Sequence, residues 1–209
     1  MKLIKTEEIR KRLSMPLPGW QAQRLMAPSY REEEMAAAME RMPDAAKSAV
    51  LILLVEKNGD LYVPFIKRAV YQGVHSGQIS LPGGRFDTGD KDVLATALRE
   101  TEEEIGIDRR IPVVLGSLSP LYIPPSNFMV YPFVAAFSGT PVYKKDDNEV
   151  REIVEIPLKA FFEKDNISEK TFESSSTGKQ KNAPYFNVGG LEIWGATAMI
   201  ISEFIEIIR

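Results

Sequence analysis

Three glutamates recur at helical spacing shortly after a glycine turn. Glu100, Glu103 and Glu104 lie at positions i, i+3 and i+4, so a helix here would carry them within a sector about 100° wide. Carboxylate oxygens are the ligands that Mg²⁺ and Mn²⁺ prefer, and these ions commonly bridge to substrate phosphates. The trio therefore predicts a divalent metal site. The alternative is a solvated acidic face, with Arg99 pairing with Glu103 at i,i+4.

The residues around the trio can position it. Pro82, Gly83 and Gly84 carry no bulky side chain, so the backbone can turn tightly and can approach an ion or a substrate phosphate. The Gly84 carbonyl is therefore a candidate metal ligand. An apolar stripe on the same predicted helix would pack it against a sheet: Leu94, Leu98, Thr101 and Ile105.

The rest of the pattern predicts an α/β fold of strands and helices in layers. The apolar run 49–56 is typical of a strand buried on both faces, and Asn58-Gly59 favours a hairpin turn into a strand at 61–67. Further strands are expected at 112–118, 129–137 and 152–156, and a hairpin at 185–188 and 191–194. Helices are expected at 3–13, 30–41, 157–162 and 196–208, an irregular arm at 14–29, and a mobile polar loop at 165–183.

The glutamate segment carries a family resemblance. It is similar to the Nudix box, in which a glycine is followed by a spaced acidic residue, an arginine–glutamate pair, two further glutamates and a glycine. The spacer from Gly84 to Arg99 is one residue longer than in the generic box, and this form resembles the box of coenzyme A diphosphatases. The matching residues are Arg99, Glu100, Glu103, Glu104 and Gly106, with Gly83, Gly84, Asp87, Asp90 and the run 96–100 for the longer form.

The resemblance extends over nearly the whole chain. Arg68, Ala69 and Gly77 stand at the subfamily's separations, whereas Gly73 replaces a second arginine and Leu81 a phenylalanine. Four further segments are similar to the same group: 17–28 (LPGWQAQRLMAP), 75–80 (HSGQIS), 148–158 (NEVREIVEIPL) and 193–198 (IWGATA).

The resemblance implies a Nudix-type α/β/α sandwich around a mixed sheet. It implies one domain over residues 1–209, with an N-terminal helical arm up to about residue 45. The implied activity is Mg²⁺- or Mn²⁺-dependent cleavage of coenzyme A or an acyl-CoA to 3′,5′-ADP and 4′-phosphopantetheine or its acyl form. The alternatives are another Nudix substrate of ADP-ribose, NADH or dinucleotide type, and a non-catalytic nucleotide-binding module.

The box glutamates are assigned different roles. Glu100 and Glu104 are expected to be direct metal ligands, and Glu103 a ligand or the group that orients or deprotonates water. Arg99 is expected to orient a box glutamate rather than to touch substrate.

Other polar residues are candidates outside the trio. Glu149 matches a glutamate that recurs in the subfamily, and is either a base supplied by a late loop or a surface charge. Arg68 either contacts a phosphate or forms a salt bridge, and His75, the single histidine, is expected to have a structural or substrate-contacting role. Asp90 is expected to cap the helix and Asp87 to support the preceding loop.

Composition agrees with a soluble intracellular enzyme, and a cytoplasmic location is expected. The chain has 209 residues, 44% of them hydrophobic, and no cysteine, which excludes a disulfide, a thiol nucleophile and a cysteine-ligated metal. A net charge of −3 argues against a nucleic-acid partner. No signal peptide or membrane span is predicted, and a homodimer through the N-terminal arm is a hypothesis.

Overall fold

The computed structural model describes residues 4–69, 77–173 and 180–209, and its largest element is a mixed sheet. Six of the strand pairings in this sheet are antiparallel, whereas β1 and β7 run parallel. The strands are β1 (Ala46–Lys57), β2 (Asp60–Arg68), β3 (Ile79–Ser80), β4 (Gly83–Arg85), β5 (Val113–Ser117), β6 (Leu121–Ile123), β7 (Phe128–Phe137) and β8 (Val150–Pro157).

Strand β1 lies in the middle of the molecule and is buried on both faces, as its apolar run predicts. Leu51 and Leu53 belong to the apolar cluster on one side of the sheet, whereas Ile52 and Leu54 belong to the cluster on the other side. This alternation follows from the two-residue period of a strand. Asn58 and Gly59 then adopt positive φ values of 52° and 81°, which confirms the predicted turn into β2.

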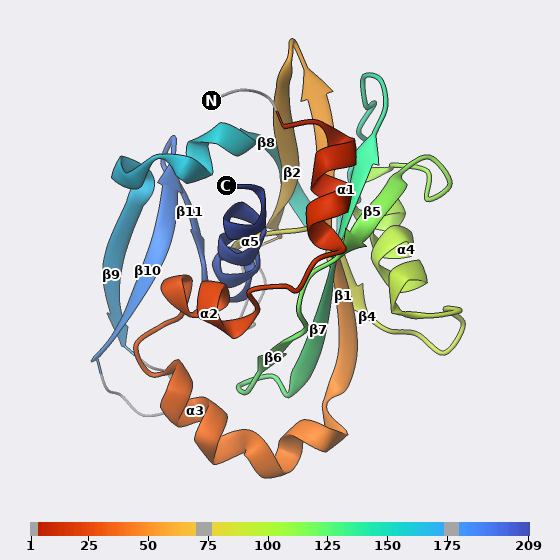
Figure 1. The fold of residues 1–209 in the computed structure, drawn as a ribbon. Coiled ribbons are helices and arrows are strands. Elements are labelled where there is room, and N and C mark those ends of the chain that lie inside the picture. The colour runs from red at the N-terminus through yellow and green to blue at the C-terminus, as the bar shows by residue number, and fades with distance from the viewer. Residues whose placement is uncertain (1–3, 70–76, 174–179) are drawn as a thin grey trace.

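Helices cover both faces of the sheet and complete the predicted α/β/α sandwich (Figure 1). Helix α4 (Val93–Ile105) packs on one face through Ala97 and Ile105. Helices α1 (Thr6–Leu13) and α5 (Gly195–Ile208) pack on the other face. Between them lie α2 (Trp20–Gln23) and a 3₁₀ turn at Arg24–Met26, so the expected irregular arm contains short helical turns.

Helix α4 begins two residues later than a cap at Asp90 would place it. Asp92, not Asp90, is its N-cap, and the Asp92 carboxylate accepts a hydrogen bond of 2.8 Å from the amide of Ala95. The helix ends at Gly106, whose φ of 76° is the left-handed conformation of a C-cap. The prediction of an Asp90 cap was therefore wrong, because Asp90 has other partners within the site.

A second sheet occupies the segment that was expected to be a mobile loop. Strand β10 (Gln180–Val188) pairs with β9 (Ile167–Glu173) on one side and with β11 (Leu191–Trp194) on the other. The loop prediction was thus wrong for 167–173 and 180–183, whereas 174–179 lie outside the described residues; the hairpin at 185–194 is confirmed. Strand β9 is an edge strand with polar side chains, so its sequence lacks the apolar alternation of a half-buried strand.

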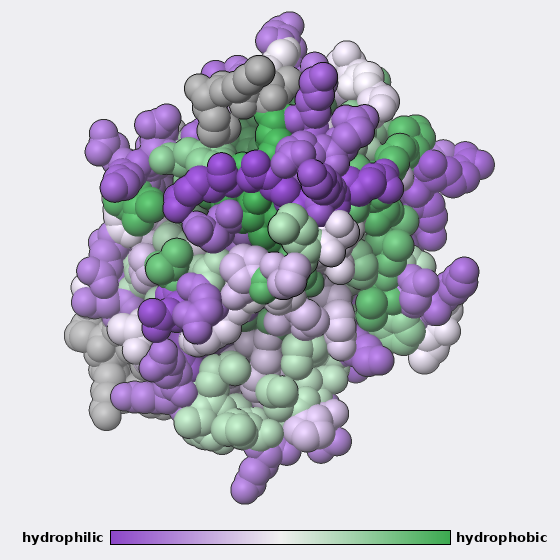
Figure 2. All heavy atoms as spheres, in the orientation of Figure 1, coloured by the Kyte–Doolittle hydropathy of each residue, from purple (hydrophilic) through white to green (hydrophobic). Residues whose placement is uncertain are grey.

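The N-terminal segment shares its core with the last helix. Ile9, Leu13 and Met26 join the same apolar cluster as α5. Helix α3 (Arg31–Ala38) and the 3₁₀ turn Met39–Asp44 then lead into β1, and apolar surface is visible over α3 in the lower part of Figure 2. In the described residues, no helix is long and apolar enough to span a membrane.

A buried carboxylate ties the N-terminal segment to α5. Glu203 is fully buried and accepts hydrogen bonds from the Gly19 amide at 3.1 Å and the Gln23 side-chain amide at 2.8 Å. The Ser119 amide donates to the same carboxylate at 3.3 Å. This network fixes the segment around Gly19 and Gln23 against α5.

We predict that Glu203→Ala lowers the free energy of unfolding by about 2–4 kcal/mol, because the buried Gln23 side-chain amide and two partly buried backbone amides lose their acceptor. Urea denaturation followed by tryptophan fluorescence measures the change. Glu206→Ala, at an exposed site on the same helix, should change it by less than about 0.5 kcal/mol. Equal small effects of both substitutions would contradict the importance of the network.

Candidate active site

The glycine turn and helix α4 meet through a buried carboxylate. Glu104 is 1% exposed, and its carboxylate accepts a 2.8 Å hydrogen bond from the amide of Gly83. Burial raises the pKa of Glu104 to about 8, although this hydrogen bond and the charge of Arg68 oppose the shift. The positive charge around Glu104 is therefore too small to offset the effect of burial, and its carboxyl group does not ionise easily.

Both glycines of the turn are required because neighbouring atoms leave no room for a side chain at either position. A Cβ atom on Gly84 would lie 2.4 Å from the carboxyl carbon of Glu100. A Cβ atom on Gly83 would lie 2.2 Å from the Ala49 carbonyl oxygen, and the Gly83 φ of 152° also disfavours a side chain. Glycine at position 83 lets β4 lie close to β1, and glycine at position 84 lets β4 pack directly against Glu100 of α4.

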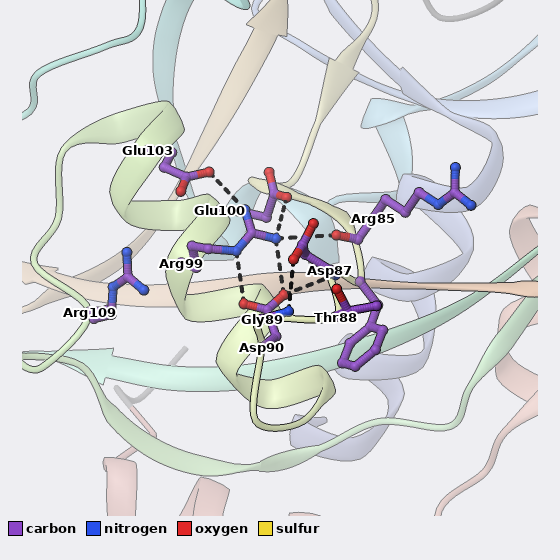
Figure 3. Close-up of a pocket in the computed structure, with 10 residues that line it drawn as sticks. Arg85, Asp87, Thr88, Gly89, Asp90, Arg99, Glu100, Glu103 and Arg109 are labelled. Carbon is purple, nitrogen blue, oxygen red and sulfur yellow. Dashed lines mark hydrogen bonds and ion pairs between the residues drawn. The ribbon is translucent and has the colours of Figure 1, made fainter.

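Arg99 pairs with acidic groups from α4 and from the loop that precedes it (Figure 3). Its guanidinium donates to both carboxylate oxygens of Asp90, at 2.9 and 3.1 Å, and to the Arg85 carbonyl at 3.2 Å. It also pairs with Glu100 and Glu103, each at 2.8 Å. These bonds lower the pKa of Asp90 to about 2 and raise the pKa of Arg99.

Arg99 therefore pairs with two box glutamates, and its role in orienting them stays a prediction. Asp90 was expected to cap the helix, but its side chain instead accepts from Arg99 and from the Thr96 hydroxyl at 2.8 Å. Asp87 accepts from the Gly89 amide at 2.8 Å and so supports the loop, as predicted.

An open pocket of about 770 Å³ lies beside this ion-pair cluster. Figure 3 shows its lining, which comes from the loop after β4 and from the exposed side of α4. Glu103 reaches this pocket with a side chain that is 52% exposed. The three box glutamates thus differ in environment: Glu104 is buried, Glu100 is half-buried, and Glu103 faces solvent while paired with Arg99.

Two residues distant in sequence join Glu100 and Glu104. Glu149, just before β8, is close enough for its charge to raise the pKa of both carboxyl groups, although burial is the larger cause in each case. The Glu149 carbonyl accepts from the Ala69 amide at 2.8 Å, which fixes it at the end of β2. Arg68, the last residue of β2, brings an opposing positive charge to Glu104.

The oxygen donors suit a hard divalent cation. Across residues 4–69, 77–173 and 180–209, no three Asp, Glu or His side chains stand in the geometry of a finished metal site. Glu100, Glu104 and Glu149 nevertheless repel one another, and the pKa values of Glu100 and Glu104 are raised. A cation among them would relieve both the repulsion and the burial of charge, so the residues present fit Mg²⁺ or Mn²⁺.

The remaining predicted contacts have different outcomes. Arg68 and Gly83 lie beside Glu104, and Gly84 lies against Glu100. His75 lies outside the described residues. The functional contributions of all these side chains stay predictions.

An acidic helix behind a glycine turn, in a sandwich of helices around a mixed sheet, is the arrangement that the resemblance implies for a Nudix protein. A family model described as NUDIX domain matches residues 45–174. The chain belongs to the Nudix family.

Relatives support this assignment over most of the chain. Nudix hydrolase 15, mitochondrial, of Arabidopsis thaliana is 35% identical over 179 residues, covering 81% of this chain and 62% of that protein. The chain thus spans less than two thirds of this relative's length. The uncharacterized Nudix hydrolase NudL of Photorhabdus laumondii is 30% identical over 168 residues, covering 80% of this chain and 88% of that protein.

Solved structures of the family are also similar to the chain. One is the MutT protein from Methanosarcina mazei Go1, which matches 78% of this chain and 93% of that chain with 17% sequence identity and a TM-score of 0.49.

We predict that Gly84→Ala weakens Mn²⁺ binding by about 10–100-fold, because the added methyl group would displace the Glu100 carboxylate. Calorimetric titration with Mn²⁺ measures the affinity. Gly89→Ala is the matched control, since its Cβ meets only an Asp87 oxygen at 3.3 Å. Equal affinities for Mn²⁺ in the two variants would contradict the prediction.

We also predict that the metal-free protein loses stability as pH rises from about 4.5 to about 8. Folded Glu104, with a pKa of about 8, keeps a proton that the unfolded chain releases near 4.5, so rising pH favours unfolding. Melting temperatures measured from pH 5 to 8.5 in chelator should therefore fall. Glu104→Gln, which cannot ionise, should flatten this fall, whereas parallel curves would show that Glu104 is not responsible.

Proposed function

We propose that this protein is a Mg²⁺- or Mn²⁺-dependent diphosphatase of coenzyme A or its acyl thioesters. The observation that carries the proposal is the buried Glu104 beside Glu100 and Glu149 at the glycine turn. Arg99 pairs with Glu100 and Arg68 brings positive charge to Glu104, yet burial keeps the pKa values of both carboxyl groups raised in this partly buried site. Such a site favours a divalent cation bridging to a phosphorylated substrate.

Glu100 and Glu104, with the Gly84 carbonyl, are the groups that would hold the metal, and Glu103 is the further candidate ligand. A bound Mg²⁺ or Mn²⁺ ion would neutralise phosphoryl charge and acidify water. Gly83 fixes Glu104 through its amide, and Arg99 fixes Glu100. Both carboxylates are therefore oriented before any ligand binds, which lowers the cost of assembling the site.

Hydrolysis then requires a group to accept a proton from water. As the water oxygen bonds to phosphorus, the bridging P–O bond breaks and the bridging oxygen leaves on the other phosphate. Glu103 and Glu149 are the candidate bases, because both side chains are exposed to solvent. Arg99 already donates to both carboxylate oxygens of Asp90 and pairs with Glu100 and Glu103, so its proposed role is to position carboxylates.

The substrate assignment rests on sequence resemblance. The long form of the box and the segments at 17–28, 148–158 and 193–198 are similar to coenzyme A diphosphatases. Arg68, His75, Gly83 and Gly84 are the proposed substrate contacts. The alternatives are a diphosphatase of ADP-ribose, NADH or dinucleotide type, and a non-catalytic module, which the complete set of box glutamates disfavours.

Three wider proposals accompany this activity. Residues 1–209 form one domain, a proposal supported by the shared core of α1, α5 and the sheet. A cytoplasmic location follows from the sequence expectation alone. A homodimer through the N-terminal arm is supported by the exposure of Met39 and Met42 after α3, at 69% and 41%.

We predict that the purified protein with coenzyme A and Mg²⁺ releases adenosine 3′,5′-bisphosphate, identified by chromatography and mass spectrometry. Glu103→Gln and Glu104→Gln should each lower turnover by about 10²-fold or more, because a base or metal ligand is lost.

Glu102→Gln is the matched control on the same helix. Glu102 pairs with Arg109 rather than with Arg99, so its loss should leave turnover close to the wild-type rate. Release of product from ADP-ribose or dinucleotides alone would move the protein to another Nudix substrate class. Normal rates in both Glu103→Gln and Glu104→Gln would refute the mechanism.

A further inference from the structure

Ser80 lies on the same face of the sheet as the candidate active site. Strand β3 pairs Ser80 with Ile66 of β2, and Ile66 packs in the apolar cluster beneath α4. The neighbours of Ser80 in the chain, Ile79 and Leu81, belong to the cluster on the opposite side. Because strand side chains alternate, the Ser80 hydroxyl must point toward α4.

Arg68 points toward the same side. It pairs with Val150 of β8, which also belongs to the cluster beneath α4. Arg68 is two residues beyond Ile66 on β2, so it is a diagonal neighbour of Ser80 across the two strands. A long side chain at this spacing reaches the same small region as the serine hydroxyl.

Both side chains have a buried hydrogen-bonding atom without a partner. The Ser80 Oγ and the Arg68 Nε are shielded from solvent and make no hydrogen bond. A buried polar group left in this state costs about 1–3 kcal/mol. Alanine would fill the position of Ser80 without this cost, so packing alone gives no reason for a serine.

The charges nearby indicate what kind of group would satisfy these atoms. The positive charge of Arg68 opposes the rise in the pKa of Glu104, and the charges of Glu100 and Glu149 also reach Glu104. The carboxylates are acceptors, yet none bonds to either atom. Consider a ligand that enters beside a cation held by these carboxylates. If it carries acceptor oxygens of its own, it would accept a hydrogen bond from both the Ser80 hydroxyl and the Arg68 Nε–H. A phosphoryl group has these properties.

We propose that Ser80 is a substrate-contacting residue whose hydroxyl, together with the Arg68 Nε–H, donates to one phosphoryl group of the bound diphosphate. The inference rests on the proposed diphosphatase function and adds a contact to it. The neutral hydroxyl fixes the position of a phosphoryl oxygen without adding charge. Arg68 supplies both a directed hydrogen bond and the positive charge.

Binding of imidodiphosphate, which resists hydrolysis, tests the proposal in the full-length protein with Mg²⁺. Calorimetry should show that Ser80→Ala weakens binding by about tenfold or more, because a hydrogen bond to a charged acceptor is lost. The urea midpoint of Ser80→Ala should stay unchanged or rise, because the variant lacks a buried unpaired hydroxyl.

Ser202→Ala is the matched control. The Ser202 hydroxyl is buried and donates to the Ala22 carbonyl at 2.8 Å, away from α4. This variant should lose stability and bind imidodiphosphate as the wild type does. Arg68→Lys keeps the charge and removes the Nε–H, and its effect should be non-additive with Ser80→Ala if both contact one phosphoryl group.

Wild-type affinity in Ser80→Ala, or a loss of affinity that accompanies a loss of stability, would overturn the proposal. Absence of imidodiphosphate binding by the wild type would also overturn it. Cleavage of coenzyme A is assayed separately in the wild type. A protein that cleaves coenzyme A but is insensitive to Ser80→Ala refutes this contact alone. A protein that binds imidodiphosphate through Ser80 but cleaves no coenzyme A refutes the proposed substrate alone.

Discussion

The hydrogen bond from the Gly83 amide to the Glu104 carboxylate joins the two halves of the candidate site. It requires β4 to lie so close to β1 at Gly83, and to α4 at Gly84, that neither position admits a side chain. The sheet provides this approach because the segment from β3 to β4 pairs first with β2 and then with β1. The catalytic proposal thus depends on a backbone contact, and the side chains of the box occupy positions that this contact determines.

The carboxylates around this contact fall into two groups whose pKa values shift in opposite directions. Arg99 pairs with Asp90, Glu100 and Glu103, and its hydrogen bonds to Asp90 lower the pKa of that carboxyl group. Glu100 and Glu104 have raised pKa values, chiefly because they are buried. The ion pairs of Arg99 form a rigid support. The two buried carboxylates have too little positive charge around them, and a substrate-bound cation would supply it.

The sequence predicts those parts of the fold whose residues obey one strong local rule. The run 49–56, the Asn58-Gly59 turn and helix α4 were all located from periodicity or turn chemistry. Strand β9 was missed because its polar residues become a strand only by pairing with β10. In the site, Asp87, Asp90 and Asp92 are all suitable N-cap residues for α4. Asp90 is not the cap because its carboxylate binds Arg99, a contact that the local sequence does not reveal. The proximity of Glu149 to Glu104 is a tertiary fact that no local pattern contains.

The anchoring of the N-terminal segment by Glu203 has a consequence for biosynthesis. Gly19 and Glu203 are separated by 184 positions, so the first helices leave the ribosome long before their acceptor exists. Until then Ile9, Leu13 and Met26 have no α5 to cover them. The nascent chain must therefore keep an apolar surface accessible throughout most of translation, which makes it a natural client for a holding chaperone.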